Sequence, residues 1–272
     1  MSATKHLLKT STVINEITKR ADKLPPITLE EMSCIKLMNR TDTKFVATFE
    51  QLLAFLTEVQ GKYFIQVKDD ERLAAYHTTY FDTSDYEMFR MHHCGRKVRE
   101  KIRVRTYMDT NDTFLEVKNK NNHGRTKKKR ILVGGVETLQ AERENVVPFL
   151  AKTAWYTLDE VSPVIENWFN RITLVNFAKT ERLTIDFNLR FHHLKTDGRD
   201  KLERVAIIEL KRDGNVPSPA LEIIRKLRIT RSGFSKYCIG TALTHKGLKS
   251  NNFKERLRMI DKMENLEKHK HI

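Results

Sequence analysis

Hydrophobic and basic residues alternate along residues 97–130, which read KVREKIRVRTYMDTNDTFLEVKNKNNHGRTKKKR. In the first half, one face carries Lys101, Arg103, Arg105 and Tyr107, and the opposite face carries Ile102, Val104 and Thr106. In the second half, Phe114, Glu116, Lys118 and Lys120 oppose Leu115, Val117 and Asn119. Because successive side chains of a strand point to opposite faces, this period of two predicts two strands. The turn-forming residues 109–112 between them predict a β-hairpin.

At least five segments repeat this pattern of charged residues opposite aliphatic ones. After His123-Gly124 we expect a third strand with Thr126, Lys128 and Arg130 on one face. The other predicted strands are residues 40–46, 76–82, 171–176, 181–191 and 205–211. The helical patterns are residues 11–23, 49–59, 85–93, 138–157 with a break near Pro148, 160–170, 221–227, 234–240 and 253–267.

This order of elements predicts one α+β domain built on an antiparallel sheet. Polar strand faces are most often solvated faces of a sheet, which is the simplest interpretation of the alternation. A second interpretation is an antiparallel β-barrel tunnel with a basic lumen, flanked by helices. The helices need apolar surfaces to pack on, and the aliphatic strand faces provide them. The polar faces then point inward, so we favour the barrel.

The charge of the chain is strongly positive and unevenly placed. Its 272 residues carry a net charge of +15. Residues 96–130 contain 13 Lys and Arg against 4 Asp and Glu, so this one segment contributes +9. An excess of this kind favours an anionic partner, such as a phosphorylated metabolite, a nucleic acid or an acidic membrane surface. Arg also presents a planar fork that binds phosphate oxygens in pairs.

The sequence excludes several other classes of protein. Cys34, Cys94 and Cys238 are far apart and form no CxxC pair, which argues against a disulfide framework or a zinc knuckle. No apolar run reaches the length of a membrane span, and the N-terminus lacks the core of a signal peptide. We therefore expect a cytoplasmic protein without a transmembrane segment. Peripheral contact with an acidic lipid surface stays compatible with its charge.

Three carboxylates stand among the cations of the basic faces: Glu116, Asp186 and Glu209. They either neutralise their neighbours or, together, hold Mg²⁺ or Mn²⁺, which prefer oxygen ligands and bridge phosphates. There is no GxxxxGK[ST] or GxGxxG motif, and the ten histidines do not pair at metal-binding spacing. We expect no specific nucleic-acid binding, because the aromatic residues are not interleaved with the basic faces as stacking platforms would require.

Nine segments in register from about residue 38 to 243 resemble the catalytic domain of vacuolar transporter chaperone (VTC) proteins, which are polyphosphate polymerases of the triphosphate tunnel metalloenzyme (CYTH-like) superfamily. The segments are RTDTKF (40–45), YFDT (80–83), IRVRTY (102–107), FLEVKNK (114–120), GRTKKKR (124–130), RITLVN (171–176), ERLTIDFNL (181–189), IIELK (207–211) and SGFSKYCIG (232–240). The resemblance implies a basic β-barrel tunnel flanked by helices. It also implies ATP as substrate, polyphosphate and orthophosphate as partners, and Mn²⁺ or Mg²⁺ as cofactor.

The resemblance also implies roles for individual residues. The cations that bind the triphosphate and the growing chain would be Lys44, Arg103, Arg105, Lys118, Lys128, Arg130, Arg171, Arg182 and Lys236. Of these, Arg103, Arg105, Lys118 and Lys236 would contact the ATP itself. The metal would be coordinated by Glu209, with Glu116 and Asp186 as further candidate ligands. Residues 40–44 have the spacing of the ExExK signature of the wider superfamily but lack its two glutamates. This departure favours the polymerase branch over the triphosphatase and cyclase branches.

Three functions follow from these observations. The first is a polyphosphate polymerase that transfers the γ-phosphoryl group of ATP to a growing chain. The second is a metal-dependent tripolyphosphatase or nucleoside triphosphatase of the same fold, with Glu116 or Glu209 as general base. The third is a non-catalytic polyanion-binding module. For domain organisation we expect an N-terminal arm over 1–28, the tunnel domain over 29–248 and an amphipathic C-terminal helix over 249–272.

Overall fold

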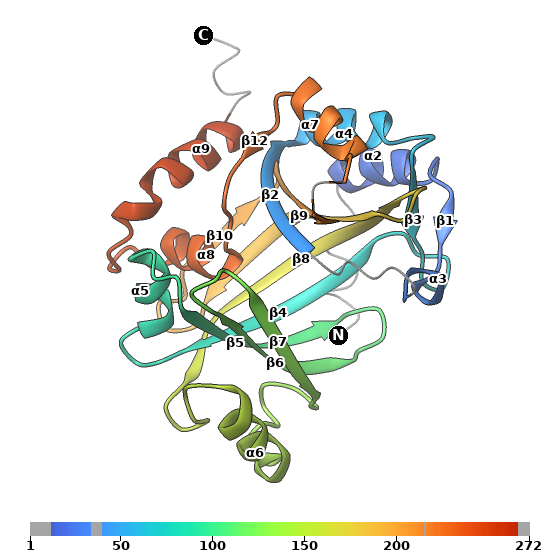
Figure 1. Ribbon diagram of the computed structural model, residues 1–272. Coiled ribbons are helices and arrows are strands. Elements are labelled where there is room, and N and C mark those ends of the chain that lie inside the picture. The colour runs from blue at the N-terminus through green and yellow to red at the C-terminus, as the bar shows by residue number, and fades with distance from the viewer. Residues whose placement is uncertain (1–11, 34–39, 215, 266–272) are drawn as a thin grey trace.

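A computed structural model of the chain describes residues 12–33, 40–214 and 216–265 (Figure 1). The helices are α2 (Thr12–Ala21), α3 (Leu29–Ser33), α4 (Phe49–Glu58), α5 (Glu87–His93), α6 (Arg143–Thr153), α7 (Pro219–Lys226), α8 (Lys236–Thr244) and α9 (Lys254–Glu264). The strands are β1 (Pro26–Ile27), β2 (Arg40–Thr48), β3 (Tyr63–Gln66), β4 (Ala74–Asp82), β5 (Arg99–Tyr107), β6 (Thr113–Lys120), β7 (Thr126–Leu132), β8 (Ser162–Asn176), β9 (Glu181–His193), β10 (Arg199–Leu202), β11 (Val205–Asp213) and β12 (Thr230–Arg231).

All the strands belong to one 12-stranded sheet, in which the order is β12-β2-β11-β9-β8-β4-β5-β6-β7. The neighbours along this order are antiparallel. The short strands β1, β3 and β10 attach to its sides. Within the described residues, β12 and β7 are the two ends of the order, so the backbone hydrogen bonds do not close the sheet into a ring. The predicted α+β architecture with a large antiparallel sheet flanked by helices is confirmed.

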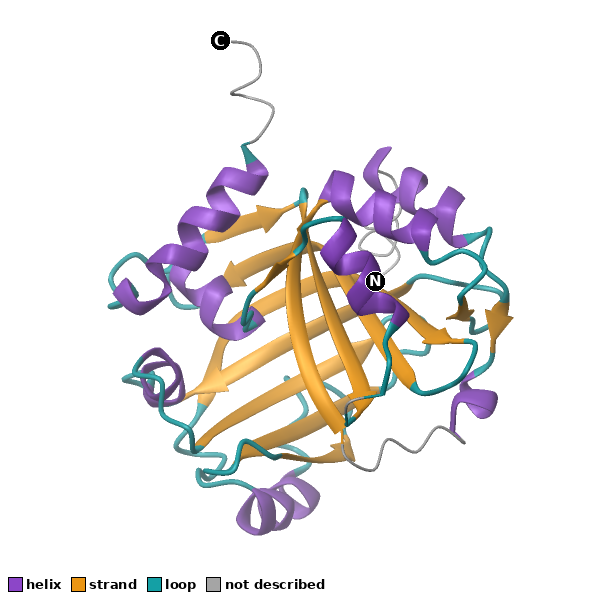
Figure 2. Cartoon of the chain, turned by 45° about the horizontal axis from the view of Figure 1, so that its top comes forward, coloured by secondary structure: helices purple, strands orange, loops and turns teal. Residues whose placement is uncertain are grey.

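The sheet curls so that strands distant in this order face one another (Figure 2). In a flat sheet β2 and β5 would lie about 24 Å apart, because five steps of about 4.8 Å separate them. The structure instead connects both strands to one loop. Lys101 of β5 donates to the Ser235 hydroxyl at 2.9 Å, and Lys44 of β2 donates to the Phe234 carbonyl at 3.4 Å. We call the face that carries these lysines the inner face.

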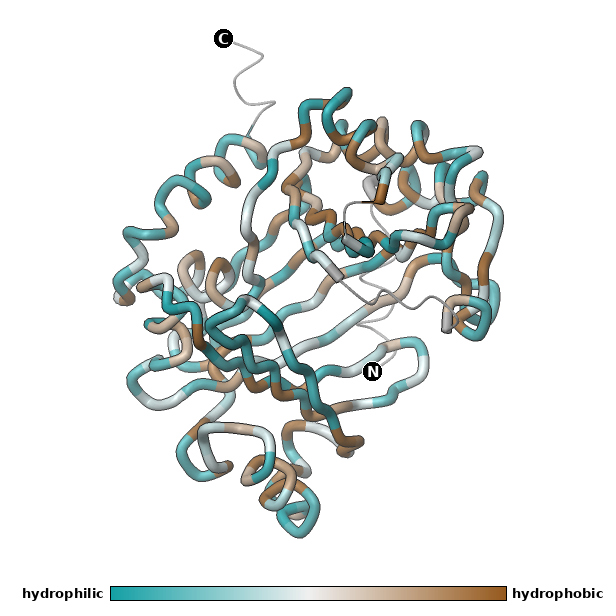
Figure 3. Tube along the Cα trace, in the orientation of Figure 1, coloured by the Kyte–Doolittle hydropathy of each residue, from teal (hydrophilic) through white to brown (hydrophobic). Residues whose placement is uncertain are grey.

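The opposite, outer face is apolar and is covered by helices, as the alternation predicts. One hydrophobic cluster joins α2, α4 and α7 to the outer residues of β2, β8, β9 and β11, including Phe45, Leu174, Ile185 and Ile208. A second cluster packs α6 on the outer residues of β5 and β6, including Val104 and Leu115. Figure 3 shows the resulting change between hydrophilic and hydrophobic positions along β5 and β6. The polar strand faces therefore point away from these helices.

Two predicted elements differ in the structure. Residues 160–170, predicted as a helix, form the first half of β8. This strand is central, with β4 and β9 on either side, and Val164 and Ile165 are both buried although they lie on opposite faces. Burial of both faces removes the alternation that marks a strand. The predicted break at Pro148 is also absent, because Pro148 lies inside α6, where its missing N–H leaves one carbonyl of the first turn without its helical donor.

At the termini, the predicted helices exist but are shorter than their sequence patterns. The pattern over 11–23 corresponds to α2, which packs against α4 and buries Ile14 and Ile17. The pattern over 253–267 corresponds to α9, which follows a short 3₁₀ turn at Asn251–Phe253. Residues 1–11 of the predicted arm and residues 266–272 of the predicted C-terminal helix lie outside the described residues. The domain boundaries stay a prediction.

Candidate active site on the inner face

The inner face gathers eight of the nine predicted cations from separate elements. They are Lys44 on β2, Arg103 and Arg105 on β5, Lys118 on β6, Lys128 on β7, Arg171 on β8, Arg182 on β9 and Lys236 on α8. The three candidate carboxylates lie among them, on β6, β9 and β11. The ninth cation, Arg130, shares the face but lies at its end, exposed over the Phe114 ring. Cations and carboxylates form three groups.

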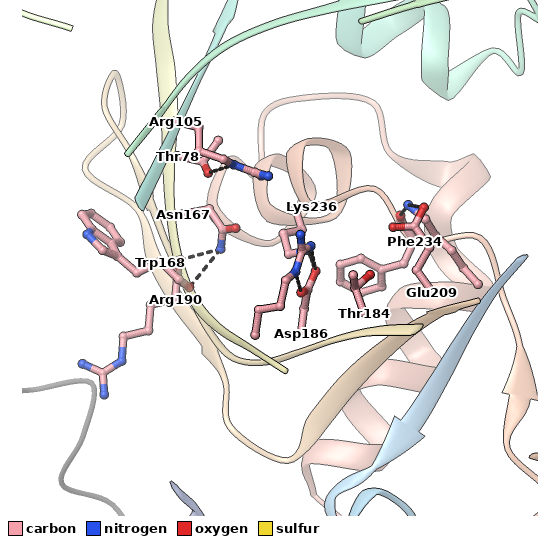
Figure 4. A network of polar contacts seen from close by, with 12 residues as sticks. Thr78, Arg105, Asn167, Trp168, Thr184, Asp186, Arg190, Glu209, Phe234 and Lys236 are labelled. Atoms are coloured by element: carbon pink, nitrogen blue, oxygen red, sulfur yellow. Dashed lines mark hydrogen bonds and ion pairs between the residues drawn. The ribbon is translucent and has the colours of Figure 1, made fainter. Parts of the chain in front are cut away.

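The first group is centred on Asp186, which is buried between Arg171 and Lys236. Arg171 donates to both oxygens of Asp186, at 2.5 Å from Nε and 2.8 Å from Nη2. Lys236 forms an ion pair with Asp186 Oδ2, and Figure 4 shows the two side chains pointing toward each other. Burial alone would raise the pKa of Asp186, but the two cations outweigh it and hold this pKa far below its usual range. Asp186 is therefore ionised, and cations contact both of its oxygens.

The second group is centred on Glu116, whose side chain is completely buried. Arg103 donates to Oε2 from Nε at 2.8 Å and from Nη2 at 2.5 Å, and Lys128 forms an ion pair with Oε1. These residues are neighbours across the β5–β6–β7 ladder, in which Arg103 lies opposite Glu116. Burial would raise the pKa of Glu116, but Arg103, Arg105 and Lys128 together lower it strongly. Like Asp186, Glu116 is held ionised by cations on both sides.

The third group, around Glu209, is looser. Its nearest cations are Lys44 Nζ, 3.8 Å from Oε1, and Lys211 Nζ, 3.6 Å from Oε2. Its side chain is 22% exposed, whereas that of Asp186 is 5% exposed. Burial opposes ionisation of Glu209, but Lys44, Lys211 and more distant cations lower its pKa to about 2. One of these is Lys118 of β6, whose charge also lowers the pKa of Glu209 although β6 and β11 are distant in the strand order.

Burial and the crowding of like charges lower the pKa values of the lysines on this face. Arg103 contributes most to lowering the pKa of Lys118 well below that of an ordinary lysine, followed by burial and Arg105. Burial lowers the pKa of Lys211 and of Lys236 to about 8, although Glu209 and Asp186 act in the opposite direction. A bound polyanion would relieve this repulsion and raise the pKa values of the lysines.

The position of Lys236 depends on the packing of α8 against the inner face. Ser235 caps the helix by accepting from the Cys238 amide, so Lys236 occupies its first turn. Gly240 allows the close approach, because a Cβ there would lie 2.4 Å from the Phe191 ring and 3.0 Å from Ile165. Next to Lys236, the Tyr237 hydroxyl donates to buried Asp82, which also accepts the amides of Met88 and Phe89 at the start of α5. Asp82 thus connects α5 and α8.

Three features of this face were missed by sequence reasoning. Lys211 was recognised as charged but not as a site residue, and Lys101 was seen only as part of the alternation. The expectation that aromatic residues avoid the basic faces is wrong. Tyr107 lies on the inner face, and arginines or Lys236 contact the rings of four further aromatic residues there, Tyr76, Tyr80, Phe114 and Phe169. For Tyr107 and Phe114 the signal was present, because the period of two places both among the cations.

The three carboxylates do not converge on one point. Each lies in its own ion-pair group, and the described residues contain no cluster of three or more His, Cys, Asp or Glu that could hold a metal ion. Cation contacts occupy both oxygens of Glu116 and of Asp186. Glu209 has the longest contacts and the most exposed side chain, which fits a hard cation that shares one carboxylate with substrate phosphates.

The chain was compared with curated protein sequences and with solved structures. No curated protein sequence matches the chain significantly. Similar solved structures include a putative adenylyl cyclase from Hippeastrum, whose title reports a dominant triphosphatase activity (13% identity, 75% of this chain and 96% of that chain covered, TM-score 0.49). Another is a putative adenylate cyclase from Vibrio parahaemolyticus (12% identity, 75% and 99% covered, TM-score 0.42).

The match to a protein family is more extensive. Residues 39–245 match the VTC domain, a range that includes every cation and carboxylate described above. None of the helices in the described residues is long and apolar enough to cross a membrane. The family match and the cationic inner face both support a function in polyphosphate or triphosphate chemistry. The chain belongs to the VTC domain family.

Proposed function

We propose that the protein is a polyphosphate polymerase, which transfers the γ-phosphoryl group of ATP to the end of an inorganic polyphosphate chain. The observation that supports this most strongly is the inner face itself. Cations from β2, β5, β6, β7, β8, β9, β11 and α8 meet there around carboxylates that they outnumber. A face of this composition suits a substrate and a product that are both polyanions.

In this mechanism the cations bind the phosphates and compensate the charge that develops during transfer. Arg103, Arg105 and Arg171 are held in place by Glu116, Thr78 and Asp186, so their guanidinium groups are oriented before the substrate arrives. An oxygen of the chain end forms a bond with the γ-phosphorus, the bond between this phosphorus and the β,γ-bridging oxygen breaks, and ADP leaves. Catalysis then consists of positioning and charge neutralisation.

A divalent cation fits this site at Glu209. Glu209 would hold it as Mn²⁺ or Mg²⁺, and the metal would neutralise part of the charge of the substrate phosphates. Glu116 and Asp186 would act as counter-ions, because arginine and lysine already contact both of their oxygens. We propose that Glu116 and Asp186 keep the neighbouring cations in place when no substrate is bound.

The protonation states of the carboxylates favour transfer to phosphate over hydrolysis. Water must lose a proton when it attacks, and an efficient general base has a pKa near the working pH. The pKa of Glu209 is lowered to about 2, and Glu116 and Asp186 are held even more strongly in the ionised state. The end of a polyphosphate chain is already ionised and needs no such base. We therefore rank the tripolyphosphatase second and the binding module third.

The test is incubation of the purified protein with γ-labelled ATP and Mn²⁺, with the products separated by chain length. A ladder of long chains that disappears in Glu209→Gln supports the polymerase. Lys128 and Lys129 provide a matched pair on β7, because Lys128 contacts Glu116 and Lys129 lies on the opposite face. Lys128→Met should reduce synthesis strongly, and Lys129→Met should leave it unchanged. Labelled orthophosphate alone would indicate the hydrolase, and intact ATP under all conditions would indicate the binding module.

A cytoplasmic location is part of this proposal, because ATP and reduced cysteines are both abundant there. Neither Cys94 nor Cys238 forms a disulfide in the structure.

A further inference from the structure

The inner face changes from cationic to aromatic at the end where β5 stops and β6 begins. Tyr107 and Phe114 meet there edge to face, with ring centroids 5.8 Å apart. Arg130 of β7 lies over the Phe114 ring at 4.2 Å, and its guanidinium donates to the Tyr107 hydroxyl at 3.5 Å. Leu132, directly opposite Phe114 in the β6–β7 ladder, completes the group. We call these four residues the aromatic mouth.

The aromatic mouth is accessible. Leu132 is 64% exposed, Arg130 is exposed, and Tyr107 and Phe114 are half-buried. The other rings on this face differ, because Tyr76 and Phe169 are buried and lie under Arg105 and Arg171. An exposed leucine beside half-buried rings exposes apolar surface to water, which is unfavourable unless a ligand covers it.

The surface continues directly into the phosphate-binding cations. Phe114 lies opposite Arg105, and two residues further along β6 Glu116 lies opposite Arg103. Two more residues lead to Lys118. Each step of two residues spans about 6.6 Å along a strand. A ligand that extends along β6 would therefore meet an aromatic and apolar group first, and a series of cations within about 7–13 Å.

We propose that the aromatic mouth binds the base of a nucleoside triphosphate while the phosphates lie over Arg105, Arg103 and Lys118. A purine is flat, so it can stack on the Arg130 guanidinium or on the exposed ring surface, and stacking of this kind tolerates any base. The triphosphate joins the base through one ribose, which matches a cationic series that begins beside the aromatic group. Polyphosphate alone has no part that would fill this surface.

This orientation gives the site a direction. With the base at the Tyr107 end, the γ-phosphate points along β6 toward Lys118, which interacts with Glu209. The acceptor chain would then enter from the other end of β5, where Lys101 contacts Ser235 at the start of α8. The inference uses the proposed function only in taking a nucleoside triphosphate as the substrate.

The experiment compares a ligand that has a base with a ligand that has none. Binding of the non-hydrolysable β,γ-imido analogue of ATP and of tripolyphosphate is measured by titration calorimetry for the unchanged protein, Phe114→Ala and Arg130→Gln. We expect each substitution to raise the Kd of the ATP analogue by about 5- to 20-fold, as loss of a base-stacking contact does. The Kd of tripolyphosphate should change less than about twofold in Phe114→Ala. Saturation-transfer NMR should show contact at the adenine protons H2 and H8, which Phe114→Ala weakens.

A matched control is Phe177→Ala. Phe177 is an exposed phenylalanine whose ring lies 4.6 Å from that of Phe64, but it follows β8 outside the aromatic mouth, so neither Kd should change. Equal losses for both ligands in Arg130→Gln and Phe114→Ala, or no loss for either, would overturn the inference. Failure of the unchanged protein to bind either ligand would overturn it as well. If the selective loss appears but no polyphosphate forms from ATP, the polymerase proposal fails and the base site stands.

Discussion

Asp186 and Glu209 lie on adjacent strands of the inner face, but cations hold them in different ways. Asp186 receives two short hydrogen bonds from Arg171 and an ion pair from Lys236, and it is almost completely buried. The nearest cations of Glu209 are 3.6 and 3.8 Å away, and its side chain is partly exposed. The tightly held carboxylate orients cations, whereas we propose that the loosely held one exchanges a lysine for a divalent cation. Two carboxylates on one face therefore have different proposed roles: Asp186 orients cations, and Glu209 binds the metal.

The largest effect should come from removing the tightly held carboxylate. Asp186→Ala leaves Arg171 and Lys236 buried side by side without a counter-ion, which should lower the free energy of unfolding by about 3–5 kcal/mol. Glu209→Ala should change it by about 1 kcal/mol or less, since its contacts are long and partly exposed. Urea unfolding monitored by circular dichroism measures both. Equal losses in the two variants would remove the distinction between the carboxylates.

A second difference should appear in metal binding. Glu209→Gln should raise the Kd of Mn²⁺ in the presence of tripolyphosphate by about tenfold or more, because the proposed ligand is lost. Asp186→Asn should leave this Kd nearly unchanged once the concentration of folded protein is matched. Electron paramagnetic resonance of free Mn²⁺ provides the measurement. If Asp186→Asn raised the Kd of Mn²⁺ more than Glu209→Gln does, the proposed assignment of the metal to Glu209 would be wrong.

Affinity for anions should depend on pH through the lysines. The pKa values of Lys211 and Lys236 are lowered to about 8 in the free protein, mainly by burial. Binding of an anion favours the charged form, so it must raise these values and take up protons near pH 8. The Kd of tripolyphosphate should accordingly rise above pH 8, by up to about tenfold per pH unit for each lysine that must be recharged.

Calorimetry in buffers of different ionisation enthalpy measures the proton uptake directly. Lys211→Arg is the matched variant, because a guanidinium stays charged over this pH range. The contribution of residue 211 to the pH dependence of the Kd should therefore vanish. A Kd that is constant between pH 7 and 9.5 would show that both lysines are already charged in the free protein.

The smallest effect concerns Glu100, a buried carboxylate on the outer side of β5 that is held by an amide instead of cations. Both of its oxygens accept from the Trp155 N–H at 3.1 Å, and burial raises its pKa to about 7. Since the folded state raises this pKa, the protonated form is favoured on folding. Its contribution to stability is complete below about pH 4.5 and is lost as pH rises through 7.

Glu100→Gln keeps a neutral side chain of similar size and should remove this loss. The melting temperature of the variant should exceed that of the unchanged protein at pH 8 by roughly 2–4 °C and match it at pH 5. Differential scanning fluorimetry at the two pH values is sufficient. The same difference in melting temperature at pH 5 and pH 8 would mean that ionisation of Glu100 is not the cause.

Much of the inner face was predictable because its strands have one polar and one apolar side. In β5 and β6 most residues of one face are charged, so the faces of Arg103, Arg105, Glu116 and Lys118 could be assigned from the period alone. The first half of β8 could not be predicted in this way, because burial on both faces leaves no alternation. The sequence pattern of residues 160–170 instead predicts a helix. A strand in the middle of a covered sheet contains little local information about its structure.

The pairing of charges was not predictable either. Asp186 and Lys236 are 50 residues apart, and their contact depends on how closely α8 approaches β9. Gly240 permits this approach, but nothing in the sequence links that glycine to Phe191. The nearness of Lys118 to Glu209 likewise arises from the curl of the whole sheet. Local patterns therefore identified the cations, and long-range packing decided which carboxylates they neutralise.

The open end of the sheet at β7 has a consequence for the solubility of the protein. β7 pairs with β6 on one side, and within the described residues no other strand pairs with it. Unpaired strand edges tend to join the edge of a second molecule and start aggregation. Here Lys127, Lys128, Lys129 and Arg130 occupy that edge, and all four are exposed. Two such edges repel each other, so the lysines that do not face the anion still keep the molecules apart, and high salt should weaken this protection.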